Sequence, residues 1–388
     1  MSAAFLAATC AVVAIVFTWV CYPCLIFVAA IARRRKAEAH RDGAPGRMRR
    51  VSVVIATRDD PDAVRRRVKN IVETAGGAGD VEIIIAVDPT SANSVGVYRD
   101  ALPSTVIVVE GDAPGGKALT LNAGVRASAR EILVFADSAQ AFREESLILL
   151  LEAFDDPTVG AASGTLVPEN NRRSLVLRLF WIYESWLRKS ESKFDSLVGV
   201  TGAIYAIRRT AWQALPAGLI LDDVFVAFAV VEQGMRVVQV NDAVAVDRRV
   251  FTADEEFIRR VRTQTGLLQL CVLRPRILNP LKTRIWIQFV LHKMMRIASP
   301  FLGVVALVGL AVDKMSAVVA AALVAVVALV FVLLRIAPQG TIAARVASQI
   351  RWAILLLVAP VVAFGHATRC DWDVWKQSTQ GNPKGRGS

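Results

Sequence analysis

The sequence predicts an α/β fold in which a mainly parallel sheet forms a cytoplasmic domain attached to about four transmembrane helices. Three observations lead to this prediction. Hydrophobic residues make up 54% of the 388-residue chain, and the mean hydropathy of +0.45 is too high for a wholly soluble protein of this size. The apolar runs lie toward the two ends of the chain. The polar stretch between them alternates short β-branched runs with helical segments, which is typical of a parallel sheet covered on both sides.

The apolar runs predict four membrane spans. Residues 3–32 carry no charge and are long enough to cross a hydrocarbon core, which needs about 20 residues. The four basic residues 33–36 follow, so we interpret this run as an uncleaved signal anchor whose basic flank stays in the cytoplasm. Residues 297–312, 317–334 and 352–366 are further uncharged runs, and the last is short for a span. This pattern predicts a multi-pass protein of the cytoplasmic (inner) membrane.

The polar stretch predicts the edge of a sheet where a ligand binds. Strands are expected at 51–56, 81–87, 105–109 and 132–135, and helices at 61–74 and 118–130. Parallel sheets bind ligands at the carboxyl ends of their strands. The residues that follow these strands include Thr57, Asp88, Lys117 and Asp137. Turn and capping roles explain any one of them, but the set of carboxylates with one lysine predicts a nucleotide or phosphate site.

Charge and cysteine content exclude several other classes of protein. The net charge of +12 could serve nucleic acid, anionic lipid headgroups or phosphorylated substrates. Nucleic acid is not expected as a partner, because the basic residues flank the predicted spans and form no stripe with interleaved aromatic residues. The five Cys and three His show no zinc spacing. Cys21 and Cys24 lie within the first apolar run, where thiols lack the surroundings that make a reactive thiolate.

The glycine-rich segment 111–118 nearly fits the phosphate loop of nucleotide hydrolases and lies between a predicted strand and a helix. Ala118, however, stands where that loop needs a Ser or Thr hydroxyl for magnesium. The sequence therefore disfavours an ATPase or GTPase.

A second interpretation takes in most of the chain. Seven segments follow one another in order: 51–58 (VSVVIATR), Asp88, 116–124 (GKALTLNAG), 134–137 (VFAD), 200–209 (VTGAIYAIRR), 221–223 (LDD) and 259–263 (RRVRT). From residue 51 to about residue 375 this series resembles the membrane-embedded glycosyltransferases of family two, which include cellulose, chitin and hyaluronan synthases. A single match is weak, but seven in order between apolar runs are specific.

The resemblance implies a GT-A (Rossmann-like) fold and an enzyme that transfers sugar from a UDP-sugar to a polysaccharide or lipid-linked acceptor with inversion. The parts it implies are a signal anchor (1–36), a cytoplasmic GT-A domain (37–250), interfacial helices with an arginine-rich motif (251–296), transmembrane helices (297–370) and a polar tail (371–388). Membrane lipids would surround the spans. Two alternatives are a transferase that adds one sugar to a single lipid, and a degenerate relative that holds nucleotide as a membrane scaffold.

Sugar transfer needs a base that takes the proton of the acceptor hydroxyl and positive charge that holds the departing diphosphate. Asp223 matches the family's base, and it follows Asp222 directly. Adjacent carboxylates repel each other, which can raise the proton affinity of one of them. The alternative is a plain helix N-terminus, where acids are stabilised by the helix dipole.

The resemblance also assigns residues to the nucleotide. Thr57 belongs to the nucleotide loop, Asp88 would contact the base, and Lys117 would approach the ribose or the diphosphate. Arg262, together with Arg259, would bind the diphosphate, because the arginine fork suits phosphate oxygens and keeps its charge. A basic patch beneath anionic headgroups is the alternative for this arginine-rich segment, and both roles are compatible.

Two departures from the family pattern affect the metal and the acceptor. Ala139 stands where the family's second Asp usually ligates a divalent ion, so Asp137 is the one carboxylate left in that motif. Mg²⁺ or Mn²⁺ is still expected, since substrate phosphates and one carboxylate can hold such an ion; a metal-independent reaction is the alternative. Thr201 and Gly202 would lie on the acceptor side. Thr263 replaces the family's Trp, which makes processive elongation less certain than transfer itself.

Overall fold

The computed structural model describes residues 2–37, 49–76, 79–169, 175–249, 252–312 and 342–373, together with isolated positions between 318 and 332. The predicted span 317–334 lies mostly outside the described residues. Most of the linker before residue 49 and of the predicted tail 371–388 lies outside them too.

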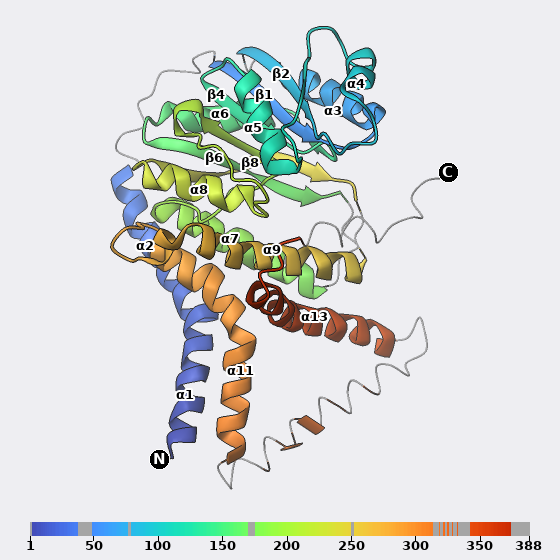
Figure 1. Ribbon diagram of the computed structural model, residues 1–388. Coiled ribbons are helices and arrows are strands. Elements are labelled where there is room, and N and C mark those ends of the chain that lie inside the picture. Colours follow the sequence, from blue (N-terminus) through green and yellow to red (C-terminus); the bar gives the residue numbers. More distant parts are fainter. Residues whose placement is uncertain are drawn as a thin grey trace.

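One sheet with helices on both faces forms the centre of the described chain (Figure 1). Its strands are β1 (Arg49–Thr57), β2 (Gly79–Val87), β3 (Ile107–Glu110), β4 (Ile132–Ala136), β5 (Gln140–Phe142), β6 (Val159–Pro168), β7 (Ile204–Arg208) and β8 (Arg236–Asp247). The helices between these strands are α3 (Pro61–Thr74), α4 (Val95–Ala101), α5 (Lys117–Ala127), α6 (Ser146–Glu152), α7 (Leu175–Phe194) and α8 (Asp222–Glu232), with short 3₁₀ turns at Ala153–Asp155 and Arg209–Ala211.

The strand order is β3-β2-β1-β4-β7-β6-β8-β5. Strands β1 to β4 are parallel, as predicted, whereas β7 runs antiparallel to both of its neighbours and β5 runs antiparallel to β8. The sheet is therefore mixed, and the predicted parallel arrangement holds for its first half. An apolar run predicts a buried strand but not its direction, which explains the difference.

Alternating residues of β1 explain why this strand lies at the centre. Val53 and Ile55 pack on one face with Val64 of α3, while Val54 packs on the other face with Leu121 of α5. A strand covered on both sides needs a continuous apolar run, which is what residues 51–56 provide. Parallel pairing then brings the carboxyl ends of β1, β2 and β4 to one edge of the sheet.

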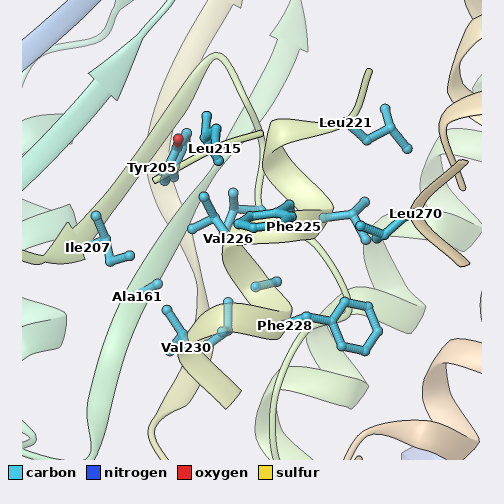
Figure 2. Packing of buried hydrophobic residues seen from close by; sticks show 14 of the residues in the cluster. Ala161, Tyr205, Ile207, Leu215, Leu221, Phe225, Val226, Phe228, Val230 and Leu270 are labelled. Carbon is cyan, nitrogen blue, oxygen red and sulfur yellow. The ribbon is translucent and has the colours of Figure 1, made fainter. Parts of the chain in front are cut away.

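Helix α8 is buried on every side. Phe225, Phe228 and Val230 pack between the sheet and Leu270 of the following helix (Figure 2). The Phe228 ring also meets Phe289 edge to face, with 5.1 Å between the ring centroids. A helix that is apolar all round belongs in a core. Its position is therefore fixed by packing, and so is that of its first residues, the two aspartates.

Two long apolar helices extend away from the sheet, side by side (Figure 1). The first comprises α1 (Ala3–Val16), the π-helical segment η1 (Phe17–Cys21) and α2 (Tyr22–Ala37); the second comprises α10 (Trp286–Gln288), η6 (Phe289–Met294) and α11 (Met295–Val312). In the described residues, only Ala3–Arg33 and Trp286–Val312 are long and apolar enough to cross a membrane. They pack closely, since a Cβ added at Gly309 would lie 2.4 Å from the carbonyl oxygen of Ala4.

The outer parts of the chain differ from the prediction in two details. The second apolar helix begins at Trp286, so residues 286–296, predicted as interfacial, are continuous with the span expected at 297–312. The span expected at 352–366 corresponds to a shorter apolar helix, Ile354–Thr368, inside α13 (Ile342–Thr368). Among the described residues, two of the four predicted spans, 3–32 and 297–312, thus correspond to helices long and apolar enough to cross a membrane, and the span predicted at 317–334 lies mostly outside these residues.

Helices α7 and α9 (Ala253–Leu273) form a layer between the sheet and the apolar helices (Figure 1). A capping box starts α9: the Thr252 hydroxyl accepts the backbone N–H of Glu255, whose carboxylate accepts the backbone N–H of Thr252. A 3₁₀ turn, Pro275–Leu278, follows it. This layer forms one wall of the site described next.

Candidate active site

A cavity of about 530 Å³ lies between the edge of the sheet, the start of α8 and the α7–α9 layer. Eight residues predicted for the site line it: Lys117, Asp137, Thr201, Gly202, Asp222, Asp223, Arg259 and Arg262. Further lining residues include Gln140, Trp181, Glu184, Ser185, Arg188, Gln239, Asn241, Arg249 and Thr263. Thr57 and Asp88 are not among the lining residues.

Lys117 is the first residue of α5 and joins two acids in the cavity. Its Nζ lies 3.2 Å from Oδ1 of Asp137 and 3.4 Å from Oδ2 of Asp222. Burial acts to lower the pKa of Lys117, but the two carboxylates outweigh it and raise the pKa above its usual value. Gly115 and Gly116 turn the chain into the helix with φ of +95° and +101°, which favours glycine. The lysine is therefore a permanent cation in the lining of the cavity.

Asp223 has the protonation behaviour of a base. Burial and the neighbouring Asp222 carboxylate raise the pKa of Asp223 from 3.8 to about 6, against the opposing effects of Lys117 and of the backbone N–H of Val224. That N–H donates to Oδ1 of Asp223 over 2.9 Å. An acid that served only the helix N-terminus would have a lowered pKa. The raised value favours the role of a proton acceptor near neutral pH.

Asp88 directly follows β2 and contacts the glycine loop that starts α5. It is 2% exposed and accepts hydrogen bonds from the backbone N–H of Thr90 (2.9 Å), the Thr90 hydroxyl (2.6 Å) and the backbone N–H of Gly116 (2.7 Å). Burial acts to raise the pKa of Asp88, but these donors and Arg58 lower it below its usual value. The carboxylate therefore holds the loop in place.

Thr57 is the last residue of β1 and, like Asp88 after β2, it holds a loop through hydrogen bonds. Its hydroxyl accepts the backbone N–H of Asp59 over 3.0 Å, and its carbonyl oxygen accepts the backbone N–H of Asp88 over 2.9 Å. The residue is buried. These bonds shape the loops that follow β1 and β2, next to the cavity.

The arginine-rich motif divides between two environments. Arg259 and Arg262 of α9 line the cavity, and Arg259 is 3.7 Å from Glu256. Burial and Arg259 lower the pKa of Arg262, whereas Asp223 and Asp222 act to raise it. Arg260 instead pairs with Glu256 at 3.2 Å and stacks over Phe180. Two arginines of the motif thus bring positive charge to the cavity.

Helix α7 supplies four lining residues that the sequence motifs did not identify. Trp181, Glu184, Ser185 and Arg188 follow the spacing i, i+3, i+4, i+7, which places them on one helix face. The recurrence of Glu184, Ser185 and Arg188 at helical spacing is the signal that could have identified this face, but it does not identify the partners of these residues.

Arg188 supports the loop that contains Thr201. Its Nη2 donates to the Ser163 hydroxyl (3.2 Å), the Thr201 hydroxyl (3.4 Å) and Oε1 of Gln239 (3.1 Å). The Ser163 hydroxyl in turn accepts the backbone N–H of Thr201 over 2.9 Å. Arg188 is also one of the groups that act to lower the pKa of Asp223. Arg188 therefore connects α7 with Asp223 through its charge and with Thr201 through a hydrogen bond.

Glu184 links the cavity wall to a buried ion cluster. His292 is 0% exposed, and its Nε2 lies 2.7 Å from Glu184 while its Nδ1 lies 2.9 Å from Glu191. Arg296 contacts Glu184 at 2.7 Å, and the Tyr22 hydroxyl donates to Glu191 over 2.6 Å. Burial acts to raise the pKa of Glu184, but His292 and the neighbouring cations hold it well below its usual range. This cluster joins both apolar helices to α7.

The residues around Asp137 fit a divalent ion that is held chiefly by its substrate. In the part of the chain that the structure describes, no group of three or more His, Cys, Asp or Glu side chains could hold a metal. The Ser138 hydroxyl donates to Asp59, and the side chain of Ala139 offers no oxygen ligand. Asp137 remains, with a partly exposed carboxylate. One carboxylate plus diphosphate oxygens and water is a common arrangement for Mg²⁺.

Comparisons with known proteins agree with this geometry. A family profile described as "Glycosyltransferase like family 2" matches residues 48–267. No curated protein matches the chain. A mannosyltransferase from Pyrobaculum calidifontis, solved with GDP-Man and Mn²⁺, is 21% identical with a TM-score of 0.65, over 92% of this chain and 98% of that one.

A second solved structure is similar over a smaller part of the chain. Glucosyl-3-phosphoglycerate synthase from Mycobacterium tuberculosis, solved with Mn²⁺, UDP and phosphoglyceric acid, is 19% identical with a TM-score of 0.40, over 58% of this chain and 78% of that one. The fold of this chain is therefore the one that the Pyrobaculum enzyme has, a mixed sheet consistent with the predicted GT-A class.

Proposed function

This chain belongs to glycosyltransferase like family 2, and from that premise we propose that it transfers a sugar from UDP to a polysaccharide or lipid-linked acceptor, with inversion, at the cytoplasmic membrane. It is a glycosyltransferase that uses a nucleotide sugar. One observation carries the finer proposal: Asp223, with a pKa raised to about 6, shares a cavity with Lys117 and four arginines.

In the proposed reaction Asp223 is the base. Its carboxylate takes the proton of an acceptor hydroxyl while that oxygen forms a bond to the anomeric carbon of the sugar. The bond from this carbon to the diphosphate oxygen breaks on the opposite side, and UDP leaves with the electron pair. A single displacement of this kind inverts the anomeric configuration. Diphosphate leaves as an anion without being protonated, so one carboxylate suffices.

The cationic side chains of the cavity would hold the departing diphosphate. Lys117 of α5 and Arg259 and Arg262 of α9 line the same cavity. Fixed cations placed where charge develops stabilise the transition state. A bound Mg²⁺ or Mn²⁺, held by Asp137 and by donor oxygens, would supply further positive charge. The Mn²⁺ named with both solved structures supports this cofactor.

The membrane location is supported by the two apolar helices. Both expose large hydrophobic side chains along their length, including Val20, Val28, Val304 and Val308. Such surfaces are expected to face lipid in a chain of this hydropathy. The α7–α9 wall of the cavity lies on the side of these helices, so a lipid-linked or membrane-associated acceptor could approach from there (Figure 1).

The test uses the full chain in detergent or lipid nanodiscs, incubated with a panel of UDP-sugars and GDP-sugars, with Mg²⁺, Mn²⁺ or EDTA. Nucleotide release and product size are measured with lipid extracts and oligosaccharides as acceptors. We expect release from UDP-sugars and the opposite anomeric configuration in the product. A ladder of lengths would indicate a polysaccharide, and one product size a single lipid transfer. Nucleotide binding without release from any donor would contradict the proposal and favour a scaffold.

A further inference from the structure

Arg249 is the second residue after β8 and lines the cavity together with Asp137 and Lys117. A two-point ion pair orients it: Nε lies 3.0 Å from Oδ1 of Asp247, and Nη2 lies 3.0 Å from Oδ2. The backbone N–H of Arg249 donates to the same carboxylate over 3.1 Å. A bidentate pair of this kind fixes the plane of the guanidinium as well as its position.

Asp247 is itself held in place. It is 1% exposed and accepts a hydrogen bond from Nε2 of Gln140 over 3.3 Å. Gln140 and Asp247 are opposite each other in the antiparallel pair β5–β8. Gln140 lies three residues after Asp137, so this pairing ties Arg249 to the segment in which the metal-binding motif has lost its second carboxylate at Ala139.

The lining of the cavity carries five cationic side chains against four carboxylates. Arg249 is one of these cations, and the pair with Asp247 fixes its guanidinium at the cavity lining. Asp137 and Asp59 also act to raise the pKa of Arg249, which indicates that it lies close to the motif.

We propose that Arg249 binds the diphosphate of the donor and replaces part of the positive charge that a two-carboxylate metal site would bring. The inference rests on the proposed function, because it takes a nucleoside diphosphate as the ligand. Ala139 removes one ligand for the ion, which weakens its retention, and Arg249 supplies a fixed cation two residues beyond Asp247, the strand partner of Gln140. Arg249 and an ion held at Asp137 would then share the negative charge of the diphosphate.

The neighbouring Arg248 offers a matched control. It carries the same charge, but it is 70% exposed, pairs with Glu169 at 3.4 Å and does not line the cavity. UDP binding to the full chain is measured by calorimetry, once in EDTA and once in Mg²⁺. Arg249→Gln is expected to weaken UDP binding in EDTA by about tenfold, as the loss of a charged hydrogen bond does. Arg248→Gln should change it by less than about twofold.

Equal losses in the two variants would overturn the proposal, since they would show a general effect of net charge. An unchanged affinity in Arg249→Gln would overturn it as well. If the wild-type chain bound neither UDP nor GDP, the proposed function would fail, which is a separate outcome.

Two further variants address folding and charge sharing. Asp247→Asn/Arg249→Gln removes both charges, so no unpaired carboxylate is left buried. Its UDP affinity should be as low as that of Arg249→Gln. A UDP affinity that returned to the wild-type value would mean that Arg249 serves only to pair Asp247. Ala139→Asp/Arg249→Gln should regain UDP affinity in Mg²⁺ but not in EDTA. A double variant that stayed as weak in Mg²⁺ as in EDTA would overturn the charge sharing.

Discussion

Two acids at the same edge of the sheet have opposite properties. Asp88, after β2, receives hydrogen bonds from backbone and hydroxyl donors, and its pKa is lowered. Asp223, at the start of α8, is crowded by Asp222, and its pKa is raised to about 6. Both are buried or partly buried carboxylates of one fold, and their residue type alone does not distinguish these properties.

The difference lies in the number of donors around each carboxylate. Donors stabilise the ionised form, so Asp88 is a permanent anion that holds a loop. Asp223 has one backbone donor and a neighbouring anion, so it can gain and lose a proton near neutral pH. A carboxylate with filled acceptor sites is structural, whereas one with few donors remains available for chemistry.

The largest expected effect comes from Asp223→Asn, which removes the base and keeps the shape. Sugar transfer should fall by about 10³-fold, within the range that a general base contributes. UDP affinity should stay within about twofold, because the diphosphate contacts other residues. Nucleotide-release kinetics and calorimetry measure the two quantities. Turnover that persisted in this variant would remove Asp223 from the role of base.

Asp88→Asn tests the other side of the comparison. One of the two carboxylate oxygens becomes an amide nitrogen, which cannot accept the N–H of Thr90 or of Gly116, so the free energy of unfolding should fall by about 2 kcal/mol. Asp112→Asn is the control: this acid lies in the same loop region but forms an exposed pair with Arg126, worth less than about 0.5 kcal/mol. Denaturant titration compares the two variants. Equal losses would show that the bonds to Asp88 are not special.

A smaller effect is expected in the pH dependence. Asp223 must be ionised to act, so kcat/KM of the wild type should decline below about pH 6. Arg188 favours the ionised form, and Arg188→Gln should therefore raise the pKa of Asp223 and move the decline to higher pH. Arg188→Lys keeps the charge and should leave the decline in place. If Arg188→Gln lowered kcat/KM by the same factor at every pH, Arg188 would only hold Thr201 in place and would not act on the pKa of Asp223.

The smallest effect is expected at Gly202. An added Cβ would lie 3.7 Å from Nζ of Lys117, an ordinary contact, so Gly202→Ala should fold normally. The added methyl group should narrow the part of the cavity that we propose for the acceptor, and raise the acceptor KM by about threefold, which corresponds to about 0.7 kcal/mol. UDP affinity should stay unchanged. Gly76→Ala, where an added Cβ meets no atom within 4 Å, is the control. A weaker UDP affinity with an unchanged acceptor KM would place Gly202 on the donor side.

Local signals predicted the first half of the fold well. The helix expected at 61–74 has those bounds in the structure, because Asp60 caps it and Pro61 fits its first turn. The carboxyl ends of strands β1, β2 and β4 were predicted from apolar runs alone. These features depend on neighbours in the chain, which periodicity and capping residues reveal.

The residues that escaped prediction depend on distant partners. Arg188 acquires its place through Gln239, 51 residues away, and His292 through Glu184, 108 residues away. No local pattern encodes such pairs. The same applies to Arg249, whose bond to Asp247 is local but whose position beside Asp137 follows from the β5–β8 pairing.

The ion cluster around His292 has a practical consequence for anyone who wishes to work with a water-soluble fragment. Cutting the chain to residues 49–285 would remove His292, Arg296 and Tyr22 and leave Glu184 and Glu191 of α7 without these counter-groups. The two acids would then repel each other on a helix that also carries Arg188. Donor binding could survive such an excision, because Lys117 and Asp137 lie at the edge of the sheet, but the α7 wall of the cavity would take a different form.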